Sequence, residues 1–209
     1  MSTQQEEQGH RWFAALYDRI TGPGERRVFT EIRPRIMGEA RGRVLEIGVR
    51  TGASLEYYSP EAQVVGTEPD PHMLKRARKR LAELGLSNVE LRQATAEEIP
   101  FEEDSFDHVV TGLVLCTVPD QKRALSEMRR VLKPDGTLRF MEHVRNDESR
   151  FWGTVQDAIT PAWRWFAAGC NPNRRTREAI EENGFRIEWI EETRIGPGTP
   201  AIYGVARRA

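Results

Sequence analysis

Cysteine is scarce in this chain of 209 residues, which contains only Cys116 and Cys170. Two cysteines give no disulfide framework, so small disulfide-held secreted domains are excluded and a reducing compartment is favoured. Long apolar runs are missing as well, because the longest apolar-leaning stretch, 109–118, falls well short of the roughly 20 residues that a membrane-spanning helix needs. Residues 1–9 are polar and show no signal peptide. We therefore expect a soluble, cytoplasmic protein.

An excess of one charge sign is also absent. The 31 lysines and arginines nearly balance the 32 aspartates and glutamates, which gives a formal net charge of −1. This balance predicts no bulk attraction to nucleic acid, and the basic run at 75–80 lies on the polar face of an amphipathic helix without interleaved aromatic residues. The histidines and cysteines show no metal-ligand spacing. We expect a small-molecule partner, no nucleic acid and no metal, with the oligomeric state open.

The most informative stretch of the chain is 43–52. It carries an apolar, β-branched run around Glu46, then Gly48 and Gly52, with a candidate helix start at Thr51. A strand that turns directly into a helix exposes backbone N–H groups and a positive dipole end, which suits a nucleotide-like cofactor. The next predicted strand ends in Glu68, and an acidic residue about 20 positions beyond a glycine loop binds a ribose diol. These spacings predict a cofactor that contains adenosine.

The loop residues favour S-adenosylmethionine over a dinucleotide. A dinucleotide loop follows the pattern G-x-G-x-x-G, whereas here Arg50 stands at the second glycine and no third glycine follows. Glu46 is a poor neighbour for a pyrophosphate but a good acceptor for an α-ammonium group. S-adenosylmethionine carries that ammonium group and no phosphate.

Predicted strands and helices alternate through most of the chain, which favours a parallel, doubly wound α/β sheet. The last two strands have no helix between them, so we expect an antiparallel hairpin at the sheet edge. Between these parts lies an aromatic segment, 151–166, which Pro161 is predicted to divide into two short helices. The expected strands are 43–47, 63–68, 88–93, 106–111, 137–144, 186–191 and 201–207; the expected helices include 10–20, 25–39, one after Thr51, one ending near Leu84 with that residue inward, one capped by Asp120, and 173–183.

The motifs between about 40 and 145 resemble those of the class I S-adenosylmethionine-dependent methyltransferases. The matching segments are 46–52, Glu68, 94–101, 105–107 and 131–136. The resemblance implies a Rossmann-like sheet of seven strands in the order 3-2-1-4-5-7-6, with strand 7 antiparallel. We expect one domain over 1–209, made of an N-terminal helical lid (1–39), a cofactor-binding core (40–145), and a helical cap with the terminal hairpin (146–209).

The resemblance also assigns cofactor-binding roles along the chain. Thr95 departs from the aspartate that the family often has at that position, and Arg50 departs from its usual glycine. We expect both departures to weaken the affinity for the cofactor without changing which cofactor is bound. The expected contacts are Glu46, Gly48, Val49 and Gly52 at the methionine part, Glu68, Pro69 and His72 at the ribose or adenine edge, Thr95 and Ala96 at the adenine, Thr111, Gly112 and Leu113 under the reactive methyl, and Tyr17 as a lid. Plain packing is the alternative for Tyr17, and an exposed position at a helix start is the alternative for His72.

A narrower resemblance covers 113–118, 140–144, 169–173 and 202–204. These segments are similar to methyltransferase-like proteins that include membrane-associated alkyl-thiol methyltransferases, whose bacterial relatives are often labelled phospholipid or quinone methyltransferases. We therefore expect methyl transfer to a small apolar acceptor, with a thiol as the first hypothesis. The alternatives are a phospholipid or quinone methyltransferase in transient contact with a membrane, and a non-catalytic cofactor-binding protein.

The acceptor chemistry points to the second half of the chain. A thiol acceptor needs a base, because the thiolate is the nucleophile, and His143 at the end of the fifth strand is the candidate. A structural role beside Glu142 is the alternative for His143, and Cys116 is either a methyl acceptor or a small buried apolar residue. The aromatic segment is either a lid over the acceptor or ordinary core. The expected acceptor pocket consists of Cys116, His143, Trp152, Trp163, Cys170 and Asn171.

Overall fold

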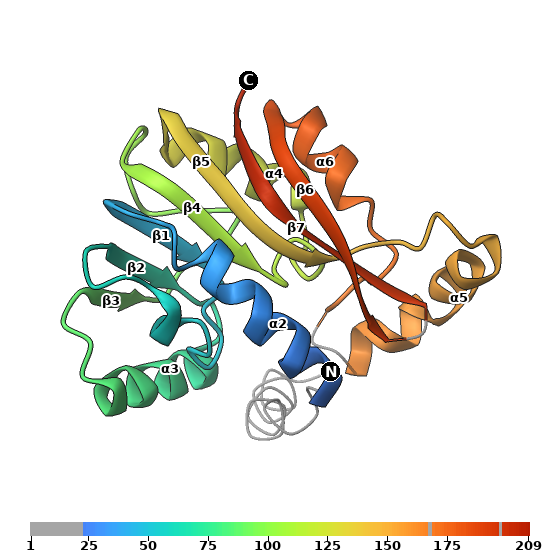
Figure 1. The fold of residues 1–209 in the computed structure, drawn as a ribbon, viewed down its shortest axis with the longest axis horizontal. Helices are drawn as coiled ribbons and strands as arrows, with labels where there is room; N and C mark the ends of the chain where they lie inside the picture. Colours follow the sequence, from blue (N-terminus) through green and yellow to red (C-terminus); the bar gives the residue numbers. More distant parts are fainter. Residues whose placement is uncertain (1–22, 167–168, 197) are drawn as a thin grey trace, which may run out of the picture.

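The computed structural model describes residues 23–166, 169–196 and 198–209, which form one sheet of seven strands with helices around it (Figure 1). The strand order is β3-β2-β1-β4-β5-β7-β6, and β7 runs antiparallel to both of its neighbours. The predicted order and the antiparallel strand are therefore confirmed. The strands are β1 (Arg43–Ile47), β2 (Gln63–Thr67), β3 (Val89–Arg92), β4 (Phe106–Gly112), β5 (Leu132–His143), β6 (Phe185–Gly196) and β7 (Thr199–Arg208).

Alternate residues of the central strands face two different helical layers, which makes the sheet doubly wound. Val44, Val64 and Val110 belong to an apolar cluster with α2, whereas Leu45 and Val109 belong to a cluster with α4 and α6. This alternation follows from the two-residue period of a strand. The helical elements are α2 (Pro23–Ile36), the 3₁₀ turn η1 (Leu55–Tyr57), α3 (Pro71–Leu84), α4 (Gln121–Val131), α5 (Arg150–Phe166) and α6 (Thr176–Glu182).

The parallel register brings the carboxyl ends of the central strands to one edge. Ile47 is paired with Thr67 on β2 and with Thr111 on β4. The residues that follow these strands, among them Gly48 and Glu68, therefore gather at that edge, where ligands bind in open α/β sheets.

Local signals explain the helix boundaries. Asp70 caps α3 by accepting hydrogen bonds from the backbone N–H groups of His72 and Met73, at 2.7 and 3.1 Å. Asp120 caps α4 as predicted, by accepting from a backbone N–H in its first turn. The prediction that Leu84 points inward is wrong: its exposed fraction is 37%, because α3 ends there and turns outward at Gly85.

The short helix expected after Thr51 is present only as the 3₁₀ turn η1, and the prediction that it begins at Thr51 is wrong. Arg50 has a φ of 53° and Gly52 a φ of 81°, and residues in this left-handed region cannot continue a right-handed helix. The chain makes tight turns instead, and only the short η1 follows. A helix dipole at this loop is therefore no part of the site.

Two further boundaries differ from the expected ones. β5 begins at Leu132, five residues before the expected start at Thr137, because Leu132 already pairs with Phe106 before the register shifts. α5 is a single helix of 17 residues, so the expected division at Pro161 is wrong. A proline removes one helical hydrogen bond, but residues on both sides of Pro161 remain helical.

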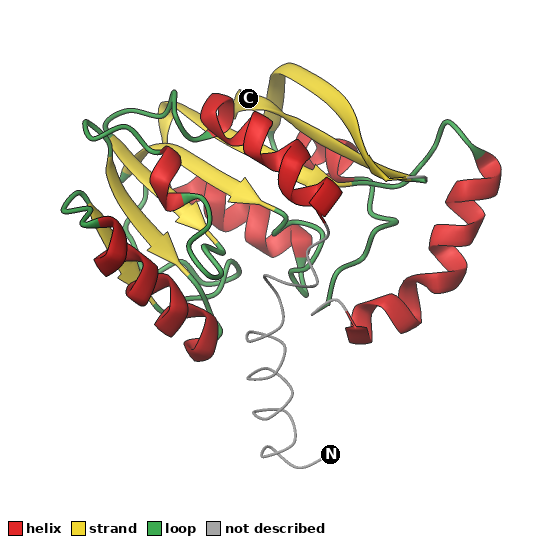
Figure 2. Ribbon diagram, turned by 60° about the horizontal axis from the view of Figure 1, so that its bottom comes forward, coloured by secondary structure: helices red, strands yellow, loops and turns green. Residues whose placement is uncertain are grey.

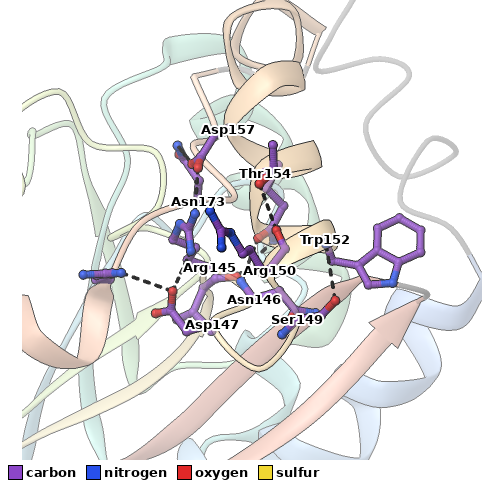
Figure 3. A network of polar contacts seen from close by, with 12 residues as sticks. Arg145, Asn146, Asp147, Ser149, Arg150, Trp152, Thr154, Asp157 and Asn173 are labelled. Atoms are coloured by element: carbon purple, nitrogen blue, oxygen red, sulfur yellow. Dashed lines mark hydrogen bonds and ion pairs between the residues drawn. The ribbon is translucent and has the colours of Figure 1, made fainter.

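α5 lies beside the sheet and covers neither face, as Figures 1 and 2 both show. Polar contacts hold its first half (Figure 3). Arg145 donates to Asp147 at 2.6 Å and to Asp157 of α5 at 2.7 Å, and Asn173 donates to Asp157 at 3.0 Å. The position of α5 thus depends on a charged group from the loop before it and on an amide from the loop after it.

One side of α5 is buried and the other is open. The buried Gln156 accepts a hydrogen bond from the backbone N–H of Asn146 at 2.7 Å. On the open side, Phe151, Ile159 and Trp163 are exposed by 69%, 44% and 45%. In the part of the chain that the structure describes, no helix combines the length and apolar character needed to cross a membrane.

Candidate active site

Glu46 places a buried carboxylate near the carboxyl end of β1. Its Oε1 accepts a hydrogen bond from the Ser54 hydroxyl. Its Oε2 has no hydrogen bond of good geometry among the described residues, although the buried Tyr58 hydroxyl interacts with this carboxylate. Burial raises the pKa of Glu46 to about 7, although the hydroxyl groups of Ser54 and Tyr58 oppose the rise. Because a buried acceptor without a donor costs free energy, a ligand that brought a cationic donor to Oε2 would be stabilised.

Glu68 provides a second buried carboxylate at the end of β2. Its two oxygens accept from the backbone N–H groups of Asp70 and Arg50, both at 3.0 Å. Burial raises the pKa of Glu68, and these two backbone donors oppose the rise. The contacts fix the carboxylate in place and leave lone pairs that hydroxyl donors of a diol can use.

Tight turns bring the backbone of the 48–52 loop close to the strand ends. Gly48 has a φ of 70°, and a Cβ there would lie 2.6 Å from Cγ2 of Val114, so only glycine fits. The N–H groups of Gly48 and Val49 already donate to the Thr67 carbonyl. The side chain of Val49 packs in an apolar cluster on α3, so this residue can contact a cofactor only through its backbone.

Arg50 bridges two sides of the predicted cofactor site. Its guanidinium donates to the carbonyl oxygen of Leu113, after β4, at 2.5 Å. The side chain therefore crosses from the β1 loop to the β4 loop and does not point into solvent. Its φ of 53° explains why glycine suits this position, and the sequence could not indicate the bridge.

The residues predicted for the ribose and adenine lie beyond β2 and β3. Pro69 and Thr95 are exposed, and His72 is half-buried in the first turn of α3. Ala96 is buried in the apolar cluster under α4. The predicted lid residue Tyr17 and the expected helix 10–20 lie outside the described residues.

The segment after β4 is held by a glutamate whose role the sequence did not indicate. Glu142 is fully buried and accepts from the backbone N–H groups of Val114 and Cys116, at 3.0 and 3.3 Å. Thr111 is fully buried, and Leu113 is 6% exposed with a φ of 60°. Glu142 thus fixes the loop predicted to lie under the reactive methyl.

The fold brings Cys116, His143 and Cys170 together. The Sγ of Cys170 lies 3.8 Å from the Sγ of Cys116 and 3.8 Å from Nδ1 of His143. The Phe29 ring is tilted against the imidazole at 6.2 Å, and Nε2 of His143 is buried without a partner among the described residues. The contact with Cys116 lowers the pKa of Cys170, and contacts with His143 and Trp163 lower it further. Burial of the Cys170 thiol acts in the opposite direction and raises this pKa.

The other predicted acceptor residues divide into two groups. Asn171 lies at the cluster, because its backbone N–H and its Nδ2 donate to the Cys116 carbonyl at 2.7 and 3.1 Å. Trp163 also reaches the cluster through its contact with Cys170. Trp152 instead packs over Gly198 in the turn between β6 and β7.

Comparisons with known proteins show which family the chain resembles. A family model described as a methyltransferase domain matches residues 45–140. Human Thiol S-methyltransferase TMT1A is 33% identical over 200 residues, which cover 93% of this chain and 82% of the human protein. The Phosphatidylethanolamine N-methyltransferase of Cereibacter sphaeroides is 38% identical over 199 residues, which cover 90% of this chain and 89% of that protein.

A solved structure supports the fold. A SAM-dependent methyltransferase from Thermotoga maritima matches with a TM-score of 0.70 at 22% identity, over 97% of this chain and 99% of that one. The site residues fit the cofactor of such enzymes, since the unpaired Oε2 of Glu46 suits an α-ammonium group and the fixed carboxylate of Glu68 suits a diol. The chain therefore belongs to the class I S-adenosylmethionine-dependent methyltransferases and is an enzyme of that family.

Proposed function

We propose that this enzyme transfers a methyl group from S-adenosylmethionine to a small apolar thiol. The observation that carries the proposal is the position of His143, whose Nε2 is buried without a partner among the described residues. It lies at the end of β5, next to the loop that Glu142 fixes. Resemblance to human Thiol S-methyltransferase TMT1A supports the same acceptor class.

The cofactor side of the proposal uses the two buried carboxylates. Glu46 accepts from the α-ammonium group through Oε2, and Glu68 accepts from the ribose hydroxyls. Thr95 and Ala96 flank the adenine, and the backbone around Gly48 and Gly52 lies along the methionine part. When bound, the cofactor supplies an electrophilic methyl group on a sulfonium sulfur.

The acceptor side of the proposal uses the residues after β4 and β5. His143 takes the thiol proton through Nε2, because the thiolate is the nucleophile. Phe29, Cys116 and Trp163 provide apolar surface around it, which keeps water from the nucleophile. Leu113 and Gly112 position the acceptor in line with the methyl group.

The test is an incubation of the enzyme with S-adenosylmethionine and hexanethiol, with release of S-adenosylhomocysteine as the measurement. We expect turnover with hexanethiol, none with hexanol, and a loss of about 100-fold or more in His143→Ala. His108→Asn is the matched control, because the His108 imidazole forms a hydrogen bond with Thr137 on the neighbouring strand and is not one of the predicted site residues. Absence of turnover together with intact cofactor binding would refute the thiol assignment and leave the cofactor assignment standing.

A second candidate acceptor is a phospholipid or quinone in a membrane. The exposed Phe151, Ile159 and Trp163 on α5 favour it, as does the resemblance to a phosphatidylethanolamine N-methyltransferase. Co-sedimentation with phosphatidylethanolamine and phosphatidylglycerol vesicles tests this candidate. Binding that is lost in a Phe151→Ser, Trp163→Ser double variant supports it, whereas protein that stays in the supernatant argues for a dissolved acceptor.

A further inference from the structure

Cys116, His143 and Cys170 form the one group of three metal-ligating side chains found in residues 23–166, 169–196 and 198–209. Their ligand atoms all lie within 4.8 Å of one another. The three residues come from the loop after β4, the end of β5 and the turn at Gly169, so their sequence spacing gave no sign of the group.

Two of the three distances between the ligand atoms match those of a tetrahedral zinc site, and the third, from Cys116 Sγ to the His143 nitrogen, is at most 4.8 Å. Zinc bonds of about 2.3 Å to sulfur and 2.0–2.1 Å to nitrogen, at tetrahedral angles, place two sulfurs about 3.8 Å apart and a sulfur and a nitrogen about 3.6 Å apart. The observed separations are 3.8 Å for both the two sulfurs and Cys170 Sγ to His143 Nδ1. We infer that Cys116, Cys170 and Nδ1 of His143 bind a zinc ion and leave its fourth position open.

Charge and burial both suit this ion. Cys116 is fully buried and Cys170 is 6% exposed, so an unbalanced charge between them would be costly. Two thiolates and a neutral imidazole around a dication have zero net charge. Sulfur and imidazole ligands select zinc over magnesium or calcium, which prefer oxygen.

The backbone around the ligands is already held in place. Asn171 donates to the carbonyls of Cys116 and Gly169 at 3.1 and 2.8 Å, which ties together the two segments that carry the cysteines. Glu142 holds the N–H of Cys116 from the other side. Such outer contacts orient ligands and raise metal affinity.

The inference that zinc binds here does not depend on the proposed function. The role of the open coordination position does rest on the proposal that the acceptor is a thiol. An acceptor thiol that takes this position loses its S–H proton to solvent and keeps the electron pair on sulfur. That pair forms the new bond to the methyl carbon, the bond from this carbon to the sulfonium sulfur breaks, and its electrons stay on that sulfur. In the zinc-loaded enzyme, His143 is then a ligand and not the base.

The experiment measures metal binding directly. The reduced, metal-free enzyme is titrated with Zn²⁺ against a chromophoric chelator, and with Co²⁺ as a spectroscopic probe. We expect one ion per chain and thiolate-to-cobalt charge-transfer absorption. Cys116→Ser, Cys170→Ser and His143→Ala should each weaken Zn²⁺ binding by more than ~100-fold, the upper end of what outer contacts alone are worth. His108→Asn should bind as the unchanged protein does.

Two results would overturn the inference. The first is that the double variant Cys116→Ser, Cys170→Ser binds Zn²⁺ with the same affinity as the unchanged protein, when circular dichroism shows that both are folded. The other is a Co²⁺ complex without thiolate absorption. A change in the Co²⁺ spectrum when hexanethiol is added without cofactor would support the open position. The metal titration can be interpreted even if the thiol assay shows no turnover, and the thiol assay can be interpreted even if no metal binds. The two proposals can therefore fail independently.

Discussion

Replacing Glu46 with glutamine tests whether the buried carboxylate binds the cofactor. Glutamine keeps the shape of the side chain and removes its charge. Because burial raises the pKa of Glu46 from 4.5 to about 7, the folded protein holds a proton there that the unfolded chain releases. Between these two values the unchanged protein loses stability as pH rises, and the full loss is reached above the folded pKa.

The size of this effect follows from the two pKa values. Each pKa unit corresponds to 1.36 kcal/mol, so a difference of about 2.5 gives roughly 3 kcal/mol. We expect Glu46→Gln to be as stable as the unchanged protein at pH 4 and about 3 kcal/mol more stable at pH 8. Urea unfolding across this pH range measures the difference in stability between the two proteins. Glu68 and Glu142 are present in both, so their contributions cancel in this difference.

Cofactor binding should change in the opposite direction. An α-ammonium group favours ionised Glu46, so binding of S-adenosylhomocysteine should weaken about tenfold for each pH unit below 7. In Glu46→Gln the affinity should be lower at pH 7.5, and this pH dependence should be absent. Isothermal titration at pH 5.5, 6.5 and 7.5 measures both. Identical pH profiles in the two proteins, or undiminished affinity in the variant, would show that the carboxylate does not bind the cofactor.

Three further substitutions test the loop and its partners. Glu68→Ala should abolish measurable cofactor binding while circular dichroism shows a folded protein, and unchanged affinity would refute the ribose assignment. Arg50→Gly removes the bridge to Leu113 and a cation near the sulfonium, so binding of S-adenosylmethionine should strengthen roughly fivefold, about 1 kcal/mol; an equal gain for S-adenosylhomocysteine, which lacks the sulfonium charge, would contradict this cause. Gly48→Ala should lower the free energy of unfolding by about 2–4 kcal/mol through left-handed strain and the clash with Val114. Val114→Ala in that background should restore the part due to the clash, measured by urea unfolding.

The strands of this enzyme could be predicted because their signals are local, whereas their order in the sheet was implied by the resemblance to the methyltransferase family. Runs such as 43–47 and 106–111 are apolar and β-branched, and the final hairpin has no helix between its strands. The acidic residues that end β1 and β2 are marked by their position after such runs. The positions of these residues follow from the strand pattern alone, whereas their contacts with a cofactor stay a prediction.

Features made by distant segments could not be predicted. The contact between His143 and Cys170 joins positions 27 residues apart, and that between the cysteines joins positions 54 apart. The helix at Thr51 failed for another reason: the left-handed φ of Arg50 depends on the turn that the strand register imposes, and helix propensity does not report it. Pro161 likewise appeared to be a helix break, although the helix continues past it.

The way α5 is held gives the two halves of this enzyme different sensitivities to ionic strength. The ion pairs of Arg145 with Asp147 and Asp157 involve carboxylates that are about half exposed, and dissolved salt screens such pairs over a Debye length of about 8 Å at physiological strength. The sheet is held by apolar burial, which salt does not screen. Added salt should therefore loosen the aromatic helix on the acceptor side while the cofactor-binding strands keep their stability.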